Sequence, residues 1–281
     1  MVVDPKDKLI NCEKENNFKI DTILYNGDIS NKMDLLFVAE GYTANQMEKF
    51  KSDVRNMTDY LFTMEPYKGR KADINIWAVE SVSQESGPDI PHHNIWRNTA
   101  ASSNFYTFRT DRYLTAPNQQ LICKLASNAP CDALYVLVNT EKYGGGGIYN
   151  FYGLCSSDGR FNKEVFIHEF GHSFAGLADE YFSSEVAYQD FYNLKYEPWE
   201  PNITTLVNFD AKWKDLLPTN TPIPTPLDDA HKDKAGVFEG GGYIAKGIYR
   251  PMDHCMMRDY APFCPACSRA ILQMVDFLTD K

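Results

Sequence analysis

The sequence predicts an α/β fold, in which the strands of a buried sheet alternate along the chain with helices. Apolar runs of strand length occupy 33–40, 74–82 and 133–138, and helical patterns at 44–63 and 117–126 separate them. Runs in which nearly every residue is apolar are typical of strands covered on both faces, as in parallel sheets. The order strand, helix, strand, helix, strand therefore favours helices layered against a central sheet.

The first elements carry boundary signals of their own. Residues 1–30 mix charged and apolar groups without a clear period, so we expect a lead-in strand or arm there. Gly41 ends the first apolar run, and Thr43 with Gln46 three residues later has the form of a capping box that opens a helix. Apolar residues then recur at helical spacing, at Met47, Phe50, Val54, Met57 and Leu61.

The middle of the chain combines a long polar segment with a glycine-rich one. Residues 83–115 show no sustained period, so we expect a surface excursion of the kind that shapes binding sites. Four glycines at 144–147 would let another chain approach the backbone closely. A helix is predicted over 162–175, because Gly176 is a typical C-terminal stop.

The last third of the sequence predicts a looser region that a final helix closes. Residues 183–250 are rich in proline, asparagine and aromatic residues and show little periodicity. From Pro265 onward, one helical face carries Ile271, Leu272, Val275 and Leu278. After the arm, we expect one domain at 31–281, with an upper lobe of about 31–176 and a lower lobe of about 177–281.

Charge and composition disfavour some classes of protein. The chain has 28 Lys and Arg against 38 Asp and Glu, and its net charge of −10 argues against nucleic-acid binding, which needs clustered cations. No window approaches the roughly 20 apolar residues of a membrane span. Residues 1–17 are too charged for a signal peptide, which fits a cytoplasmic protein or a mature exported one. Aromatic-rich stretches favour a bacterial protein that is secreted, periplasmic or on the cell surface, and we expect a monomer.

The strongest chemical signal is the segment His168-Glu169-Phe170-Gly171-His172 inside the predicted helix. Histidines at i and i+4 lie on one helix face about one turn apart, so both imidazoles can bind one metal ion. Glu169 lies beside them, where a carboxylate can act on a water held by the metal. The alternative, two solvated histidines, is disfavoured by the apolar neighbours Val165, Phe166, Ile167 and Phe170.

A catalytic zinc ion usually takes three protein ligands and leaves one position for water, so a third ligand is expected. Gly176 allows the chain to turn back under the metal, and Asp179 is the preferred candidate beyond it. Glu180 is the neighbouring alternative, although acids at a helix end also pair with Lys or Arg. Further candidates are His254 and, with a different lobe architecture, Glu197 or Glu200.

The cysteines leave several interpretations open. Seven is an odd number, so at least one cysteine is unpaired or bonded to another chain. The segment Cys264-Pro265-Ala266-Cys267 suggests structural zinc or redox chemistry, but a zinc site needs four ligands and only Cys255 stands nearby. A redox motif needs a preceding strand, which is not evident. A disulfide, internal or to Cys255, is therefore favoured in an exported chain, and buried free thiols otherwise.

These residues resemble a known family. The stretch 168–181, His-Glu-Phe-Gly-His-Ser-Phe-Ala-Gly-Leu-Ala-Asp-Glu-Tyr, is similar to the signature of the IgA peptidase family of bacterial zinc metallopeptidases. The resemblance extends to 37–42, to 143–147 and to 250–258, so it spans most of 33–272. Several separated motifs in the same order are more specific than the five-residue core alone.

The resemblance implies a metzincin-like fold, with a twisted mixed sheet and an active-site helix above the cleft and a smaller, loop-rich C-terminal lobe below it. A turn bearing a methionine closes that lobe, and Met257 is the residue expected there, with Met256 as the alternative. In metzincins the third ligand follows the second histidine by six residues. That position here is Ala178, and Asp179 comes one residue later.

Together, the residues and the resemblance predict a zinc-dependent endopeptidase that acts on extended protein or peptide substrates. Zinc would bind through His168, His172 and Asp179, and Glu169 would be the general base. Tyr260 is a candidate donor to the developing oxyanion. The substrate backbone would pair with an edge strand at Gly145, Gly146, Gly147 and Ile148. The alternative is a catalytically idle surface protein- or glycan-binding module, against which the intact Glu169 argues.

Overall fold

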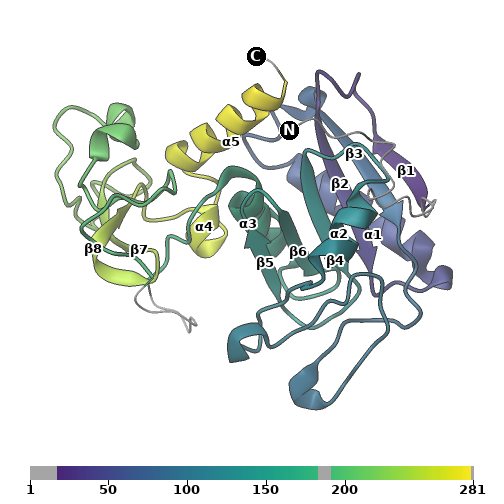
Figure 1. Cartoon of the computed structure of the whole chain (residues 1–281). Coiled ribbons are helices and arrows are strands. Elements are labelled where there is room, and N and C mark those ends of the chain that lie inside the picture. Colours follow the sequence, from purple (N-terminus) through teal and green to yellow (C-terminus); the bar gives the residue numbers. More distant parts are fainter. Residues whose placement is uncertain (1–17, 183–190, 280–281) are drawn as a thin grey trace, which may run out of the picture.

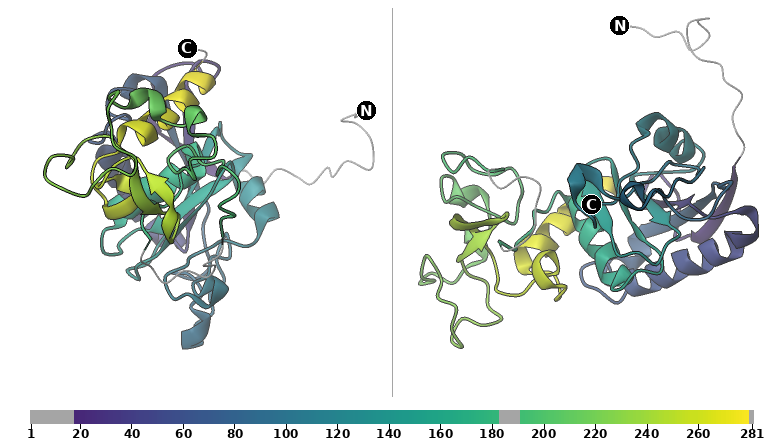
Figure 2. Two further views of the ribbon diagram at one scale, coloured as in Figure 1. Left: turned by 90° about the vertical axis from the view of Figure 1, so that its left-hand side faces the viewer. Right: turned by 90° about the horizontal axis from the view of Figure 1, so that it is seen from below.

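The computed structural model describes residues 18–182 and 191–279, which form a larger and a smaller lobe (Figure 1). The larger lobe holds the main sheet, and the smaller lobe, built mostly from residues 191–250, lies to one side of it (Figure 2). Among the described residues, no helix has the length and apolar character needed to cross a membrane.

A mixed sheet of six strands forms the centre of the larger lobe, in the order β1-β3-β2-β4-β6-β5. Its strands are β1 (Lys19–Leu24), β2 (Met33–Glu40), β3 (Ile74–Glu80), β4 (Ala133–Val138), β5 (Gly145–Ile148) and β6 (Tyr152–Ser156). The four central strands are parallel, while β1 and β5 pair antiparallel at the two edges. The α/β prediction is confirmed. The predicted lead-in strand corresponds to β1, and residues 1–17 of the predicted arm lie outside the described residues.

The central strands carry apolar side chains on both faces of the sheet, and helices cover both of these faces. Every residue of β2 is buried. Leu35 and Phe37 pack in one core with α1 (Met47–Leu61) and α3 (Asn162–Ala175). Leu36 and Val38 point the other way, into a second core with α2 (Gln119–Ala126). The bounds predicted for α3 are confirmed.

Helix α1 begins at the predicted capping box. The Thr43 backbone N–H donates to the side-chain oxygen of Gln46 at 3.0 Å. The first turn, Ala44–Gln46, is a 3-10 helix, and the α-helix starts one residue later at Met47. The apolar positions predicted from helical spacing are buried, which fixes the face that α1 turns toward the sheet.

The polar segment 83–115 is held against the sheet. Glu40, at the end of β2, is fully buried, and its carboxylate accepts hydrogen bonds from the backbone N–H groups of Ala101 and Ser103, at 2.5 and 2.8 Å. Phe105 and Leu114 are buried in the core on the α2 side. The predicted surface excursion is therefore anchored at these positions by a buried carboxylate and two apolar side chains, while most of its other residues are at least partly exposed.

The smaller lobe contains a hairpin of β7 (Phe238–Gly241) and β8 (Ile244–Arg250), which no periodicity in the sequence had indicated. The short helix α4 (Met256–Asp259) and the final helix α5 (Pro265–Leu278) then return the chain to the larger lobe. Both contact α3, so α3 lies at the junction of the two lobes (Figure 1). The helix predicted from Pro265 is confirmed.

Candidate metal centre

Helix α3 ends in a tight reversal. Phe166 and Phe170 are fully buried in the core against the sheet, which fixes the rotation of the helix. At the C-terminal end, Gly176 has a φ of +62°, and its N–H donates to the His172 carbonyl at 3.1 Å. This left-handed φ angle favours glycine, and a Cβ at this position would also lie 2.7 Å from the edge of the Trp199 ring.

The reversal brings Asp179 back to the two histidines. The Nε2 atoms of His168 and His172 lie 3.1 Å apart. Asp179 Oδ1 lies 2.9 Å from the first of these atoms and 3.3 Å from the second. Atoms bound tetrahedrally to one zinc ion at about 2.0–2.1 Å are about 3.3–3.4 Å apart. The three donor atoms therefore have the spacing of ligands to a single metal ion.

Backbone carbonyls fix which nitrogen of each imidazole faces this cluster. His168 Nδ1 lies 3.0 Å from the Met256 carbonyl oxygen, and His172 Nδ1 lies 2.5 Å from that of Leu177. A carbonyl only accepts, so each Nδ1 carries a proton, and in the neutral ring each Nε2 presents a lone pair. Such carbonyls are common partners of metal-binding histidines, because they set the tautomer and orient the ring.

A buried carboxylate oxygen and two imidazole nitrogens that face one another favour a positive charge between them. The Tyr243 hydroxyl donates to Asp179 Oδ2, whereas the buried Oδ1 atom faces only the two imidazoles among the described residues. Although burial lowers the pKa of His172, the Asp179 carboxylate raises it to about 9. The cluster therefore attracts cations, and one divalent ion would satisfy all three acceptors at once.

Glu169 lines the same cavity as the histidines, beside strand β5. A Cβ on Gly145 would lie 3.0 Å from the Glu169 Oε1 atom. Burial raises the pKa of Glu169 above its ordinary value, which suits a carboxyl group that exchanges protons closer to neutral pH. Tyr260 also lines the cavity. Its hydroxyl lies 3.0 Å from that of Tyr143, and its ring centre lies 5.8 Å from that of His168.

The two candidate turn methionines occupy different places beside α3, and both are fully buried. A Cβ on Gly171 would lie 2.8 Å from the Met257 sulfur, so the Met257 thioether packs on the helical turn that carries His168 and His172. Met256 contributes its carbonyl to His168. Of the two candidates, Met257 is therefore the one whose side chain is shown to contact this turn of α3.

Comparison with known families agrees with this geometry. The family model for IgA peptidase M64 matches residues 22–235 and 227–275, which together cover most of the chain. This chain belongs to the IgA peptidase M64 family. The resemblance identified in the sequence is confirmed, and membership implies a metallopeptidase, a hydrolase of peptide bonds. No significant match to a curated protein was found.

In this M64 peptidase, the glycines of β5 make room for α3. A Cβ on Gly147 would lie 2.5 Å from the Glu169 carbonyl oxygen and 2.7 Å from His172 Cβ. The close approach expected at these glycines is thus made by the helix that carries the histidines. β5 is an edge strand as predicted, but the Leu114 N–H donates to the Gly145 carbonyl at 3.4 Å. The part of the edge open to a substrate is therefore shorter than the strand.

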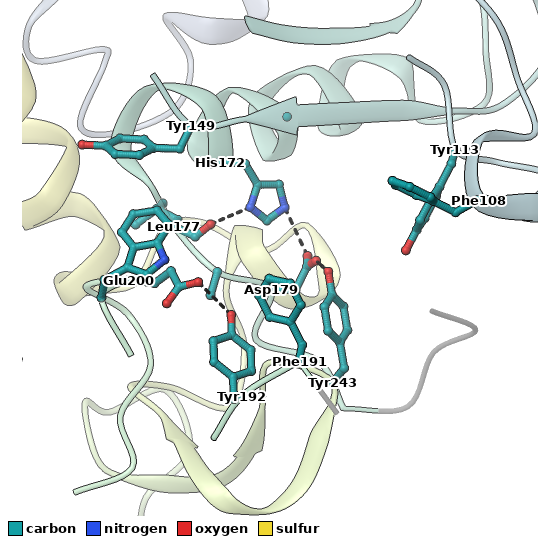
Figure 3. A pocket seen from close by; sticks show the side chains of 13 residues that line it. Phe108, Tyr113, Tyr149, His172, Leu177, Asp179, Phe191, Tyr192, Glu200 and Tyr243 are labelled. Carbon is teal, nitrogen blue, oxygen red and sulfur yellow. Dashed lines mark hydrogen bonds and ion pairs between the residues drawn. The ribbon is translucent and has the colours of Figure 1, made fainter. Parts of the chain in front are cut away.

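Two cavities of the M64 peptidase meet at the His-Asp cluster. The larger cavity, of about 570 Å³, is lined by residues of β5 and by Glu169. The smaller, of about 250 Å³, contains His172 and Asp179, and its wall is largely aromatic (Figure 3). Its aromatic residues are Phe108, Tyr113, Tyr149, Phe191, Tyr192, Trp199 and Tyr243. Glu200 also lines it and accepts a hydrogen bond from the Tyr192 hydroxyl at 2.9 Å.

The remaining ligand candidates do not join the His-Asp cluster among the described residues. His254 is exposed, and its Nδ1 atom lies 2.5 Å from an oxygen of Asp259. Glu197 accepts a hydrogen bond from the Asn208 backbone N–H at 3.0 Å. Glu180 is fully buried and faces a different set of side chains, the cysteines.

Sequence analysis missed Tyr243, whose hydroxyl bonds to Asp179. Tyr243 lies in the turn between β7 and β8 with a φ of +67°, and no local pattern marks it. The carbonyls of Leu177 and Met256 were missed as well, because a backbone group carries no signal in the sequence.

Proposed function

We propose that this protein is a zinc-dependent endopeptidase with a metzincin-like active site. The observation that carries the proposal is the convergence of three buried or half-buried donor atoms, Asp179 Oδ1 and the Nε2 atoms of His168 and His172, which lie 2.9–3.3 Å from one another. Two imidazoles and one carboxylate are typical ligands of catalytic zinc. The packing of Met257 on α3 supports the metzincin-like arrangement, with the third ligand one residue beyond Ala178.

In this proposal each polar side chain of the larger cavity has one role. A zinc ion held by His168, His172 and Asp179 supplies a Lewis acid and a water of lowered pKa. Glu169 accepts a proton from the attacking water and donates it to the leaving amine, a task favoured by its raised pKa. The Tyr260 hydroxyl donates a hydrogen bond to the oxyanion that develops on the scissile carbonyl.

The substrate is an extended polypeptide that lies along the open part of β5, at Gly146, Gly147 and Ile148. Backbone pairing with an edge strand gives affinity without strong dependence on side chains. Both cavities contain His172 and Asp179, so substrate side chains on the two sides of the scissile bond have separate places to bind. This arrangement favours cleavage within a chain over removal of terminal residues.

Metal content and turnover of Glu169→Gln test the assignment. We expect this variant to keep its zinc and to lose hydrolysis by about 10²-fold or more, because only the base is removed. Glu164→Gln is the matched control: Glu164 lies on the same helix, 3.4 Å from the Tyr60 hydroxyl, and its variant should keep both zinc and activity. Unchanged turnover in Glu169→Gln would refute the role of Glu169. A zinc-loaded wild type that cleaves no peptide in a mixed library would instead indicate a binding module.

A further inference from the structure

A second cluster of ligand-type side chains is buried next to the candidate metal centre. It consists of Glu180, Cys255, Cys264 and Cys267, whose donor atoms all lie within 4.8 Å of one another. These residues come from three separate segments: the chain after α3, the residue before α4, and the start of α5. Four buried donors are the usual number for a structural zinc site.

The spacing of these donors fits a tetrahedral metal ion better than a disulfide. The sulfur atoms of Cys255 and Cys267 lie 3.7 Å apart, whereas a disulfide bond measures about 2.05 Å. Two sulfurs at about 2.3 Å from one tetrahedral zinc ion are about 3.8 Å apart. Glu180 Oε1 lies 3.2 Å from Cys267 Sγ and 3.9 Å from Cys264 Sγ. For an oxygen and a sulfur on the same ion, about 3.6 Å is expected.

The protein alone leaves the Glu180 carboxylate incompletely satisfied. Glu180 is fully buried, with 0% exposure. The Asn202 side-chain amide donates to Oε1 at 2.9 Å, but Oε2 has no hydrogen-bond partner within the described ranges. A buried carboxylate is costly unless a positive charge pairs with it, and a bound divalent ion provides that charge.

Backbone N–H groups point at two of the three sulfurs. The Cys264 N–H donates to Cys255 Sγ and the Cys267 N–H donates to Cys264 Sγ, each at 3.4 Å. Both N–H groups lie at the start of α5, where the helix dipole also favours negative charge. These two N–H groups stabilise negative charge on the Cys255 and Cys264 sulfurs, and the thiolate is the form of cysteine that binds metals.

We propose that Glu180, Cys255, Cys264 and Cys267 bind a structural Zn²⁺ ion, in addition to the catalytic ion of the proposed function. Three soft thiolates favour zinc over magnesium or calcium, and four protein ligands leave no position for a reacting water. The sequence near the three cysteines offered no fourth ligand, and the structure brings Glu180 to that position from a distant segment. The proposal does not depend on peptidase activity, because none of these four residues belongs to the His-Asp cluster.

The second site joins the segments that hold the candidate metal centre. Glu180 directly follows Asp179, and its N–H donates to the Met257 carbonyl at 2.8 Å. Cys255 directly precedes Met256, whose carbonyl orients His168. A zinc ion bound here holds Asp179 and the methionine turn in register with α3, so the four ligands act as positioning residues.

Zinc counts on the full-length protein test the proposal. We expect two zinc ions per chain in the wild type, one in His172→Ala and one in Cys264→Ser. Cys155→Ser is the matched control, because Cys155 is a buried cysteine of β6 outside the cluster, and it should retain two. A second measurement leaves the cysteines unchanged. His172→Ala protein loaded with cobalt in place of zinc should show the near-ultraviolet absorption of thiolate-bound cobalt.

Each outcome decides for or against the second site. A His172→Ala protein without zinc and without the cobalt–thiolate absorption would overturn it. A disulfide among Cys255, Cys264 and Cys267, found by mass spectrometry of the unreduced protein, would overturn it too. If only the proposed catalytic site is wrong, the wild type and His172→Ala both hold one thiolate-bound zinc ion, and that result supports the second site.

Discussion

Replacement of Gly147 by alanine tests the closest contact between β5 and the helix that carries the histidines. The added Cβ would lie 2.5 Å from the Glu169 carbonyl oxygen and 2.7 Å from His172 Cβ, whereas ordinary contacts begin at 3.4 Å. Both neighbouring atoms belong to or adjoin the helix backbone, so neither can rotate away. β5 and α3 must therefore separate by about 0.7–0.9 Å, the difference between these distances.

The size of this shift sets the expected effects of Gly147→Ala on stability and rate. Overpacking of this kind lowers the free energy of unfolding by roughly 1–3 kcal/mol. At about 2–4 °C per kcal/mol, the melting temperature should fall by about 2–12 °C. A displacement near 1 Å of the groups that act on the substrate should lower kcat/KM by about 10²-fold.

Calorimetry and peptide-cleavage kinetics measure these two effects. Gly241→Ala is the matched control, because Gly241 is a buried strand glycine whose added Cβ meets nothing closer than 3.6 Å. We expect this control to keep the wild-type melting temperature and kcat/KM. The same result for Gly147→Ala would refute the view that α3 rests directly on β5.

Three further changes test other parts of the site. Tyr243→Phe removes the donor to Asp179 Oδ2, so zinc affinity measured against a competing chelator should fall about 10–100-fold, and unchanged affinity would exclude this role. Asp179→Ala should release the catalytic zinc in elemental analysis, while His254→Ala, at an exposed position, should retain it; the reverse result would exchange their roles. Acetylated and amidated peptides of about ten residues should be cleaved internally. Mass spectra that show trimming of free-ended peptides alone would identify an exopeptidase.

The local part of the site could be predicted from the sequence because short-range geometry determines it. The helical period places His168 and His172 on one face, and Gly176 marks the point where the chain reverses. These two rules limit the third ligand to a few residues after the helix. The structure brings Asp179 to the histidines and places Glu180 elsewhere.

Long-range partners could not be predicted in the same way. Tyr243 reaches Asp179 from a hairpin that has no clear period, and Glu180 meets the cysteines only after the chain has folded. The sequence indicated a close approach at the β5 glycines, but the sequence of a strand does not identify the element that contacts it. The sequence therefore could not indicate that α3 makes this approach.

The backbone bonds of 178–181 alternate in direction. The Ala178 N–H and carbonyl bond to the Asn202 side chain at 2.7 and 2.8 Å. The carbonyls of Asp179 and Tyr181 accept from N–H groups of the β7–β8 turn, at 2.8 and 3.0 Å, while the Glu180 N–H donates toward the methionine turn. This alternation is typical of an extended chain, in which successive side chains point to opposite sides.

The extended chain explains why the proposed third ligand, Asp179, lies one residue beyond the position that the metzincin spacing predicts. Ala178 packs with Ile203 and Ile248, and Glu180 faces the cysteines, while Asp179 between them faces the histidines. A shift of one residue that aimed position 178 at the histidines would turn every following side chain to the other side. It would remove Glu180 from the cysteine cluster, and the three cysteine sulfurs would be the only donors left there. Asp179 and Glu180 must therefore stay adjacent in the sequence, because one register of this segment places Asp179 at the histidines and Glu180 at the cysteines.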